Sequence, residues 1–166
     1  MSAKPKTSRE QILAAARILI EQKGLEAVSM QEVADAVGIR TPSLYKRFKD
    51  RADLLAAVSK AGGEDLQKVL EAAVIPGKTR KSLTRMASEY RMFAKRHSIP
   101  TKASIDSFAA VFRERTGERR AELGAICLTA YVIGFVSSEA SGALDGLQVN
   151  ELFESGLELT IEALLS

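Results

Sequence analysis

Residues 29–51, SMQEVADAVGIRTPSLYKRFKDR, decide the fold that we expect for the chain. Ser29 and Glu32 form a capping-box pair, in which each side chain can satisfy a free N–H of the other residue at the start of a helix. Apolar side chains then recur at helical spacing, and Gly38 can end the helix because glycine takes a left-handed conformation without steric cost. The segment therefore predicts a short amphipathic helix that ends in a tight turn.

A second short helix is expected directly after this turn. Thr41 is a good N-cap residue, and Pro42 suits the first helical position, where no backbone N–H is needed. Leu44 and Phe48 lie four residues apart and should face inward. Two helices of this kind, the second with basic residues outside, are typical of a helix-turn-helix that places a helix in the major groove of DNA. The residues left outside have side chains suited to contact with phosphates and base edges: Arg40, Thr41, Ser43, Lys46 and Arg47.

The residues around this segment resemble the TetR family of bacterial transcriptional regulators. The resemblance runs from about Arg9 to Val58 and includes the motifs ILAAARILIEQKGLEAVSMQEVADAVGI and LYKRFKDRADLLAAV. It implies an all-α protein with an N-terminal three-helix DNA-binding domain and a C-terminal helical domain that binds an effector and dimerises. The domains are then expected at residues 9–58 and 59–166, after a disordered basic tail at residues 1–8.

The resemblance also implies roles for individual residues of the helix-turn-helix. Ser29 would cap its helix and bind a phosphate, and Arg51 would bind another with help from the positive end of its own helix. Arg51 stands where the family usually has Lys, and Arg47 stands where His is frequent. The residues implied to face base edges are Gln31, Arg40, Thr41 and Pro42, and those implied to contact phosphates or neighbouring bases are Ser43, Tyr45 and Lys46.

Charge is distributed unevenly along the chain, although the net charge of the 166 residues is only +3. Residues 1–51 carry ten Lys or Arg against six Asp or Glu, and residues 52–120 carry fourteen against eight. Residues 121–166 carry seven acidic residues and no Lys or Arg. The N-terminal part is therefore expected to meet a polyanion. We interpret the basic run from Lys78 to Arg96 as the solvated side of an amphipathic helix, with a second nucleic-acid face or an acidic-ligand pocket as alternatives.

The sequence does not favour export, a membrane, a metal or an enzyme. An apolar signal segment is missing, and the longest nearly apolar run, residues 123–136, is shorter than the ~20 residues that span a bilayer. Cys127 and His97 are the single cysteine and histidine, so a disulfide, a metal site and a thiol–imidazole pair are not expected. We expect a bacterial cytoplasmic protein, associated with the nucleoid when bound to DNA, without cofactor, metal or catalytic residues.

The rest of the chain predicts helices separated by short breaks. Breaks are expected at Pro76–Gly77 and Ile99–Pro100, and Gly62–Gly63 marks either a hinge between the domains or a local weakening of one helix. No strand is required. The expected helices are Ser8–Lys23, Asp50–Val74, Thr79–His97, Lys102–Phe112, Glu118–Leu144 and Val149–Leu165.

The last two helices are expected to form a homodimer contact. The helix from Glu118 is apolar round much of its circumference, and the final helix has a broad apolar face, which one subunit would struggle to cover alone. A four-helix bundle between two copies would bury both. The contact residues of this prediction are Leu128, Val132, Leu152, Phe153, Leu157 and Ile161.

An ordinary apolar core would explain the aromatic and methionine residues of the C-terminal part equally well. An effector pocket is therefore expected only from the family resemblance. Its candidate lining consists of Met86, Tyr90, Phe93, Phe108, Phe112, Tyr131 and Phe135. The expected function is a dimeric repressor that binds a palindromic operator in double-stranded DNA and is released by a small-molecule effector. Two alternatives stay open: a ligand-insensitive dimeric regulator, and a nucleoid architectural protein that binds DNA with little sequence preference.

Overall fold

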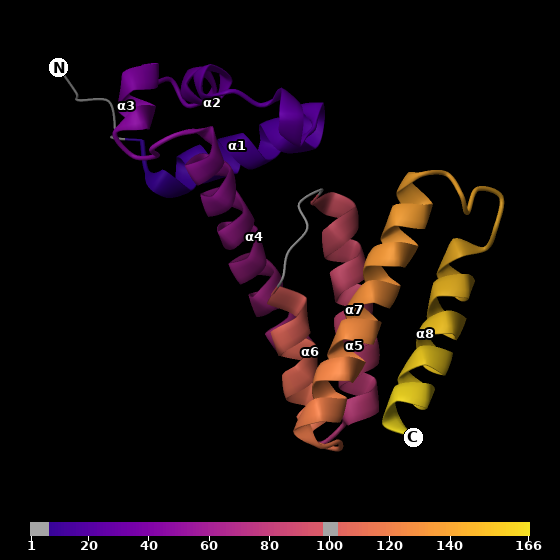
Figure 1. The fold of residues 1–166 in the computed structure, drawn as a ribbon. Coiled ribbons are helices and arrows are strands. Elements are labelled where there is room, and N and C mark those ends of the chain that lie inside the picture. The colour runs from indigo at the N-terminus through magenta and orange to yellow at the C-terminus, as the bar shows by residue number, and fades with distance from the viewer. Residues whose placement is uncertain (1–6, 98–102) are drawn as a thin grey trace. The chain divides into compact units, whose positions relative to one another are not determined.

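All regular elements of the computed structural model, which describes residues 7–97 and 103–166, are helical (Figure 1). The predicted all-α class is therefore confirmed. The chain divides into two compact units, Met1–Gly62 and Gly63–Ser166, close to the boundary after Val58 that the sequence predicts. Helix α4 (Arg51–Ala73) is continuous through Gly62 and Gly63, so it contributes to both units. The first six residues of the expected basic tail and the break at Ile99–Pro100 lie outside the described residues.

The N-terminal unit contains α1 (Arg9–Lys23), the 3-10 turn η1 (Leu25–Ala27), α2 (Met30–Ala36), α3 (Thr41–Tyr45) and the first part of α4. Ser8 caps α1, because its hydroxyl accepts the Gln11 N–H while the Gln11 side chain accepts the Ser8 N–H. The apolar residues that the helical spacing placed inward form the core of the unit: Ile12, Ala16, Ile20, Val28, Met30, Val33, Ala34, Leu44, Phe48, Leu54 and Val58 are buried.

The start of α3 differs by one residue from the sequence prediction. Thr41 is the first helical residue, and Arg40 occupies the N-cap position without a side-chain capping bond. The physical reason is that the Thr41 hydroxyl donates to the side-chain carbonyl of Gln31 on α2 and does not cap its own helix. Pro42 is thus the second helical residue, where its missing N–H is again without cost. Gly38 has φ +68° in the turn, as expected for a residue that ends α2.

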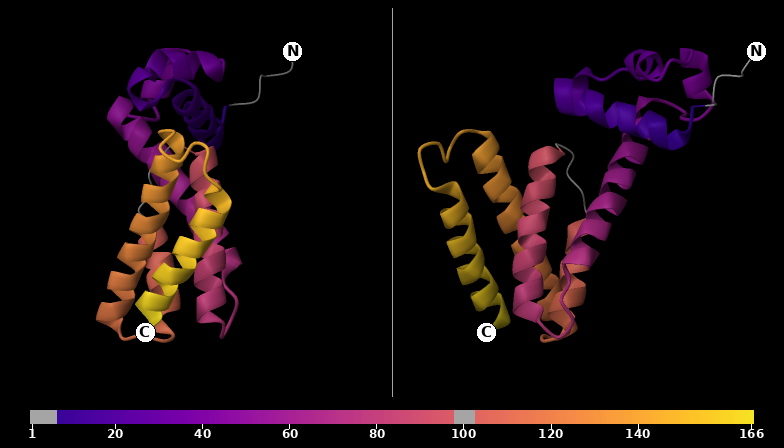
Figure 2. Two further views of the ribbon diagram at one scale, coloured as in Figure 1. Left: turned by 90° about the vertical axis from the view of Figure 1, so that its right-hand side faces the viewer. Right: turned by 180° about the vertical axis from the view of Figure 1, so that it is seen from behind.

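The C-terminal unit is a bundle of α5 (Thr79–Arg96), α6 (Ala103–Arg113), α7 (Glu118–Ala140) and α8 (Val149–Leu165), with the end of α4. Consecutive helices run in opposite directions, and α7 packs against α5, α6 and α8 (Figure 2). The sequence prediction carried α7 on to Leu144. The helix ends earlier because Gly142, with φ +75°, takes a left-handed conformation just beyond it.

Helix α7 is long and apolar enough, by length and composition alone, to cross a membrane. The longest nearly apolar run of the sequence, residues 123–136, is shorter than this 23-residue helix, because the helix also includes the residues on either side of the run. A third of its apolar stretch is buried inside the unit. In this fold α5 and α7 each pack against the other helices from α5 to α8.

A partly buried ion cluster links α5 to the end of α7. The Arg91 guanidinium donates from Nε and Nη2 to the two carboxylate oxygens of Glu139, at 2.9 and 2.7 Å, and Lys95 Nζ lies 2.9 Å from Oε1 of the same carboxylate. The guanidinium also lies over the rings of Phe135 and Phe153, 5.2 and 4.5 Å from their centroids. Hydrogen bonds from Arg91, and secondarily from Lys95, lower the pKa of Glu139 to about 2.

Replacing Gly156 on α8 by Ala should destabilise the C-terminal unit, although Ala is the better helix former. A Cβ at residue 156 would lie 2.6 Å from the hydroxyl oxygen of Tyr131, which donates to the Phe153 carbonyl at 2.8 Å. Overpacking costs about 1–3 kcal/mol, against a propensity gain of about 1 kcal/mol. Chemical denaturation of Gly156→Ala, Tyr131→Phe and the double variant measures the free energies of unfolding.

The double variant should recover part of the loss, because Tyr131→Phe removes the obstructing oxygen and leaves ring carbons at 3.3 Å or more from the new Cβ. Strictly additive effects of the two substitutions would show that the hydroxyl is not the obstacle.

Candidate nucleic-acid interface

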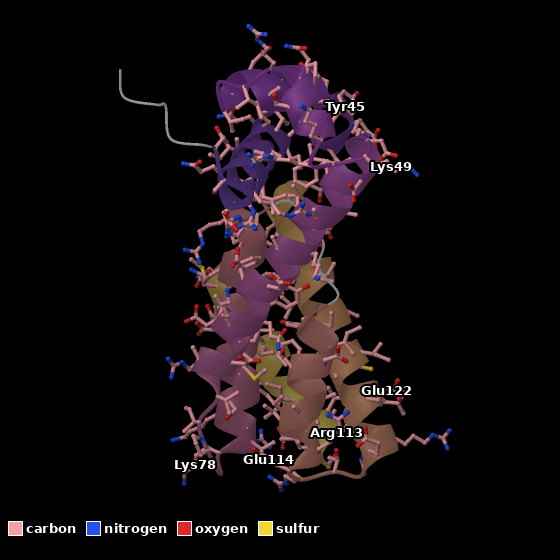
Figure 3. All side chains as sticks on the ribbon, turned by 90° about the vertical axis from the view of Figure 1, so that its left-hand side faces the viewer. Tyr45, Lys49, Lys78, Arg113, Glu114 and Glu122 are labelled. Carbon is pink, nitrogen blue, oxygen red and sulfur yellow. The ribbon has the colours of Figure 1, made fainter. Side chains whose placement is uncertain are left out.

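Helix α3 is held in place by two buried side chains and presents the others outward. Leu44 and Phe48, on and just after the helix, are almost completely buried. Tyr45 is 52% exposed and projects from the unit, as Lys49 does nearby (Figure 3). Of the predicted DNA contacts, those exposed are Ser29, Gln31, Arg40, Pro42, Ser43, Tyr45 and Lys46, and those half-buried are Thr41, Arg47 and Arg51.

The N-terminus of α2 is fixed by a network around Ser29. The Ser29 hydroxyl accepts the Glu32 N–H at 3.2 Å and donates to Glu32 Oε2 at 2.9 Å, while Lys23 Nζ lies 2.6 Å from Glu32 Oε1. Bonds from Lys23, and then from Ser29, lower the pKa of Glu32 to about 2. Because this pKa is depressed, the capping box is complete above pH ~4.5 and is lost as the pH falls towards ~2. A phosphate at Ser29 must replace its bond to Glu32.

Two residues expected at base edges are joined by a hydrogen bond. The Thr41 hydroxyl donates to Oε1 of Gln31, and Gln31 Nε2 donates to Oδ1 of Asp35 at 2.8 Å. The chain of bonds orients the Gln31 amide, with its carbonyl towards α3 and its nitrogen towards Asp35. One N–H of Gln31 stays available to an acceptor such as a base edge. Asp35 was not selected from the sequence, although its spacing of four residues from Gln31 on one helix is the signal that would have found it.

Arg51 is engaged mainly inside its own unit. Its Nε donates to the Val28 carbonyl at 2.7 Å, and Nη2 donates to the Leu25 carbonyl. Glu26, at 4.0 Å from Nη2, is a more distant partner. The guanidinium therefore braces the η1 turn against the start of α4, and only its remaining N–H groups can serve a phosphate. The phosphate role that the family resemblance implies for Arg51 stays a prediction.

A further cation, Arg9, was missed in the sequence analysis. Its guanidinium lies 4.4 Å from the centroid of the Phe48 ring and donates to the Arg47 carbonyl at 3.4 Å. Burial of Phe48 thus places a charge from α1 beside the end of α3. An open hollow of about 1110 Å³ lies between α1 and the helix-turn-helix, and its polar lining includes Gln11, Ser43, Lys46 and Arg47.

The exposed groups of this arrangement can bind an anion. Exposed or half-exposed cations lie just before α3, at Arg40, and just after it, at Lys46 and Arg47, and hydroxyl groups lie between them on the helix. Such a mixture suits phosphate contact together with base-edge hydrogen bonds. Within residues 7–97 and 103–166, no group of three or more His, Cys, Asp or Glu side chains is placed to hold a metal ion.

The residues predicted to line an effector pocket are packed together in the C-terminal unit. They belong to the hydrophobic core of the bundle, in which Tyr131 and Phe135 are the partly buried members. The Tyr90 and Phe108 rings lie 6.4 Å apart, and the Phe112 ring fits against Gly124. The fully packed members of the predicted set are Met86, Tyr90, Phe93, Phe108 and Phe112.

The predicted dimer contacts also lie mostly in the core of the subunit. Leu152 is 44% exposed, whereas the other five side chains, Leu128, Val132, Phe153, Leu157 and Ile161, are buried against residues of the same chain. Helical spacing identified the apolar residues correctly, but on a helix that is apolar all round it could not tell which face points inward. On the outward side of α7 and α8, Leu152 is exposed together with residues outside the predicted set. The exposed residues are Leu123, Ile126, Cys127, Ala130, Ile133, Gly134, Leu152 and Leu159. We call this set the apolar face.

Comparison with known proteins agrees with this geometry in the N-terminal unit. Residues 12–58 match the family described as bacterial regulatory proteins, tetR family. The HTH-type transcriptional repressor BdcR of Escherichia coli (strain K12) is 49% identical over 49 residues, which cover 30% of this chain and 25% of BdcR. The match thus spans about a quarter of the length of this curated relative. The resemblance seen in the sequence is confirmed for the helix-turn-helix unit.

Solved structures extend the similarity of the fold to the whole chain. A protein of unknown function from Rhodococcus sp. RHA1 superposes with a TM-score of 0.84 over 100% of both chains, at 24% identity. A TetR variant from Acinetobacter baumannii AYE, in complex with minocycline, has a TM-score of 0.72 at 21% identity and covers 97% of this chain and 99% of its own. At these identities the similarity shows the fold.

Substitution of Arg51 should lower the stability of the N-terminal unit, whereas substitution of Lys46 should not. Arg51→Ala removes donors from the Leu25 and Val28 carbonyls, which should lower the stability of the N-terminal unit by about 1–2 kcal/mol, since the side chain is partly exposed. Lys46 is exposed, so Lys46→Ala should leave stability within about 0.5 kcal/mol of the parent. Hydrogen exchange of the α1 and α2 amides measures both effects. Unchanged exchange in Arg51→Ala would contradict the bracing role.

Proposed function

Because its N-terminal unit belongs to the tetR family of bacterial regulatory proteins, we propose that this protein is a sequence-specific DNA-binding transcriptional regulator. It binds a palindromic operator as a homodimer, represses transcription from it in the bacterial cytoplasm, and leaves it when a small molecule binds. The observation that carries the proposal is α3, which is anchored by Leu44 and Phe48 and turns Ser43, Tyr45 and Lys46 outward.

The division of labour on the DNA follows from the chemistry of the exposed groups. Arg40, Lys46 and Arg47 supply charge for phosphates, which gives affinity and a strong salt dependence. Gln31 can form paired hydrogen bonds with an adenine edge, and Thr41 can contact a base edge or a thymine methyl. The hydrogen bond that Gln31 donates to Asp35 fixes which atoms Gln31 presents. Asp35 acts here as a positioning residue, because its carboxylate is repelled by the phosphates of DNA.

The apolar face supports the homodimer. Leu159 is 70% exposed and Leu123 is 55% exposed, and exposed side chains of this size are costly unless a partner covers them. Ala130 and Gly134 lie among them on α7 and allow close helix approach. Pairing through this face is isologous and closes the assembly at two subunits. Two copies also supply two α3 helices, as a palindrome with half-sites about 34–36 Å apart or a multiple of that distance requires.

Repression and release rest on the relatives. BdcR is a repressor, and the Acinetobacter structure holds minocycline; we extend repression and ligand binding to this chain as proposals. A ligand-insensitive regulator is the second candidate, and the close packing of Met86, Phe108 and Phe112 favours it. An effector must therefore either open this core or bind elsewhere in the C-terminal unit.

Selection of bound sequences from a random DNA pool tests the DNA-binding proposal. The parent protein should enrich a palindrome with two half-sites at near-physiological salt. Gln31→Ala should keep salt-dependent binding but lose discrimination at one position of each half-site, by about 1–3 kcal/mol. Binding without an enriched motif would instead support the architectural protein.

Charges placed on the apolar face should dissociate the dimer. Ile126→Glu combined with Leu159→Glu would bury carboxylates without partners, and should weaken self-association by about tenfold or more. Met92→Glu is the control, because Met92 is 52% exposed on α5 and lies outside the apolar face. Sedimentation velocity over a concentration series measures the association, and circular dichroism checks the fold. Dimers of undiminished strength in the double variant would place the contact elsewhere.

A further inference from the structure

A hollow of about 680 Å³ lies at the end of the helical bundle where α5 ends and α7 passes into α8. Such a volume is in the range of small-molecule sites. Its walls are mostly apolar, and its polar groups are few and belong to Lys95, His97, Ser137, Glu139 and Asp145. The apolar lining consists of Ala94, Ile133, Val136, Ala140, Leu144 and Val149.

Lys95 supplies a cation to the lining of this hollow, and its partner, Glu139, is already paired with a second cation. Both carboxylate oxygens of Glu139 already accept from the buried Arg91 guanidinium, at 2.7 and 2.9 Å. Lys95 adds a third bond to Oε1, at 2.9 Å, and its side chain remains 45% exposed, against 8% for Arg91. If Lys95 turns away, Glu139 keeps a bidentate partner of opposite charge, so little is lost by the release of its ammonium group.

The Arg91–Glu139 pair also fixes the place of Lys95. Arg91 is held over the Phe135 and Phe153 rings, and Glu139 follows one helical turn after Phe135 on α7. The Glu139 carboxylate therefore holds the Lys95 ammonium group at the polar edge of an apolar hollow. There the ammonium group can exchange its bond to Glu139 for a bond to an anionic ligand. The ligand that fits has an apolar body and a single anionic head.

We propose that this hollow binds an amphipathic monocarboxylate, whose hydrocarbon body lies against Ile133, Val136 and Leu144 and whose carboxylate pairs with Lys95. This inference names the chemical class of the effector in the proposed function. Binding of the ligand is argued from the hollow alone, and only the effect of the ligand on DNA binding rests on the proposed function. Ile133 belongs both to the hollow and to the apolar face. A ligand here therefore alters a surface that a second subunit covers.

Asp145 offers the opposite chemistry on the same lining. Its carboxylate lies near the Gly142 backbone and would attract a ligand with an ammonium head. The anionic ligand is favoured because Lys95 is held at the lining by its bond to Glu139, a counterion that Arg91 fixes in turn. Asp145 lies in the connection between α7 and α8.

Three probes with one hydrocarbon body test the proposal: 4-phenylbutyrate, 4-phenylbutanol and 4-phenylbutylamine. Isothermal titration calorimetry on the full chain should show binding of the carboxylate, and weaker binding of the alcohol and the amine. Lys95→Met, which keeps the apolar stem, should weaken carboxylate binding by about tenfold or more. Lys81→Met, an exposed lysine on the same helix, and Asp145→Asn should bind the carboxylate as the parent does. Ala140→Phe, which fills the hollow from its exposed rim, should abolish binding, and circular dichroism checks that each variant folds.

The outcomes separate this inference from the proposed function. Equal binding of carboxylate and alcohol, preference for the amine with loss in Asp145→Asn, unchanged binding in Lys95→Met, or no carboxylate binding at millimolar concentration would each overturn the inference. DNA binding by the ligand-free protein is measured separately by sequence selection, so its absence would refute the regulator and leave the ligand result standing. If both hold, phenylbutyrate should weaken the complex of the parent protein with its selected operator and leave that of Lys95→Met unchanged.

Discussion

A helix of five residues cannot hold its shape through its own hydrogen bonds, because forming the first turn costs more than one or two bonds return. The presentation of α3 therefore depends on the burial of Leu44 and Phe48 in the core of the N-terminal unit. That core exists because α1 and the start of α4 supply Ile12, Ala16, Leu54 and Val58. Every group that faces outward from α3 inherits its position from this packing, including the charge that Arg9 places beside the helix end.

The sequence predicted most reliably where one residue type has one structural use. Ser29 with Glu32 is a capping box in the structure as in the sequence, and Gly38 takes the left-handed conformation. The prediction was wrong for the cap of α3, because Thr41 bonds across to Gln31 and does not cap the helix. The sequence also did not indicate that Arg51 bonds to backbone carbonyls, which only the folded η1 turn brings within reach. Such contacts depend on tertiary structure, which spacing along the chain does not contain.

The faces of α7 and α8 were the least predictable part. Leu128 and Ile133 are similar in chemistry and lie five residues apart, but one is buried in the subunit and the other is 43% exposed. Periodicity assigns a face only when the opposite side is polar, and α7 has small and apolar residues on both. The ion cluster of Arg91, Lys95 and Glu139 was also not foreseen, because Glu139 lies more than forty residues from the two cations and meets them only when α5 and α7 pack.

Helix α4 belongs to two cores at once, with Leu54 and Val58 buried in one and Leu66, Leu70 and Ala73 in the other. Neither unit can unfold completely without exposing the end of a helix that the other still holds. The cost of that exposed end is lowest at Gly62 and Gly63, since glycine is about 1 kcal/mol less favourable in a helix than alanine. Partial unfolding of α4 is therefore expected to stop at these two glycines. One half of the helix can then unfold while the other half stays helical against its own core.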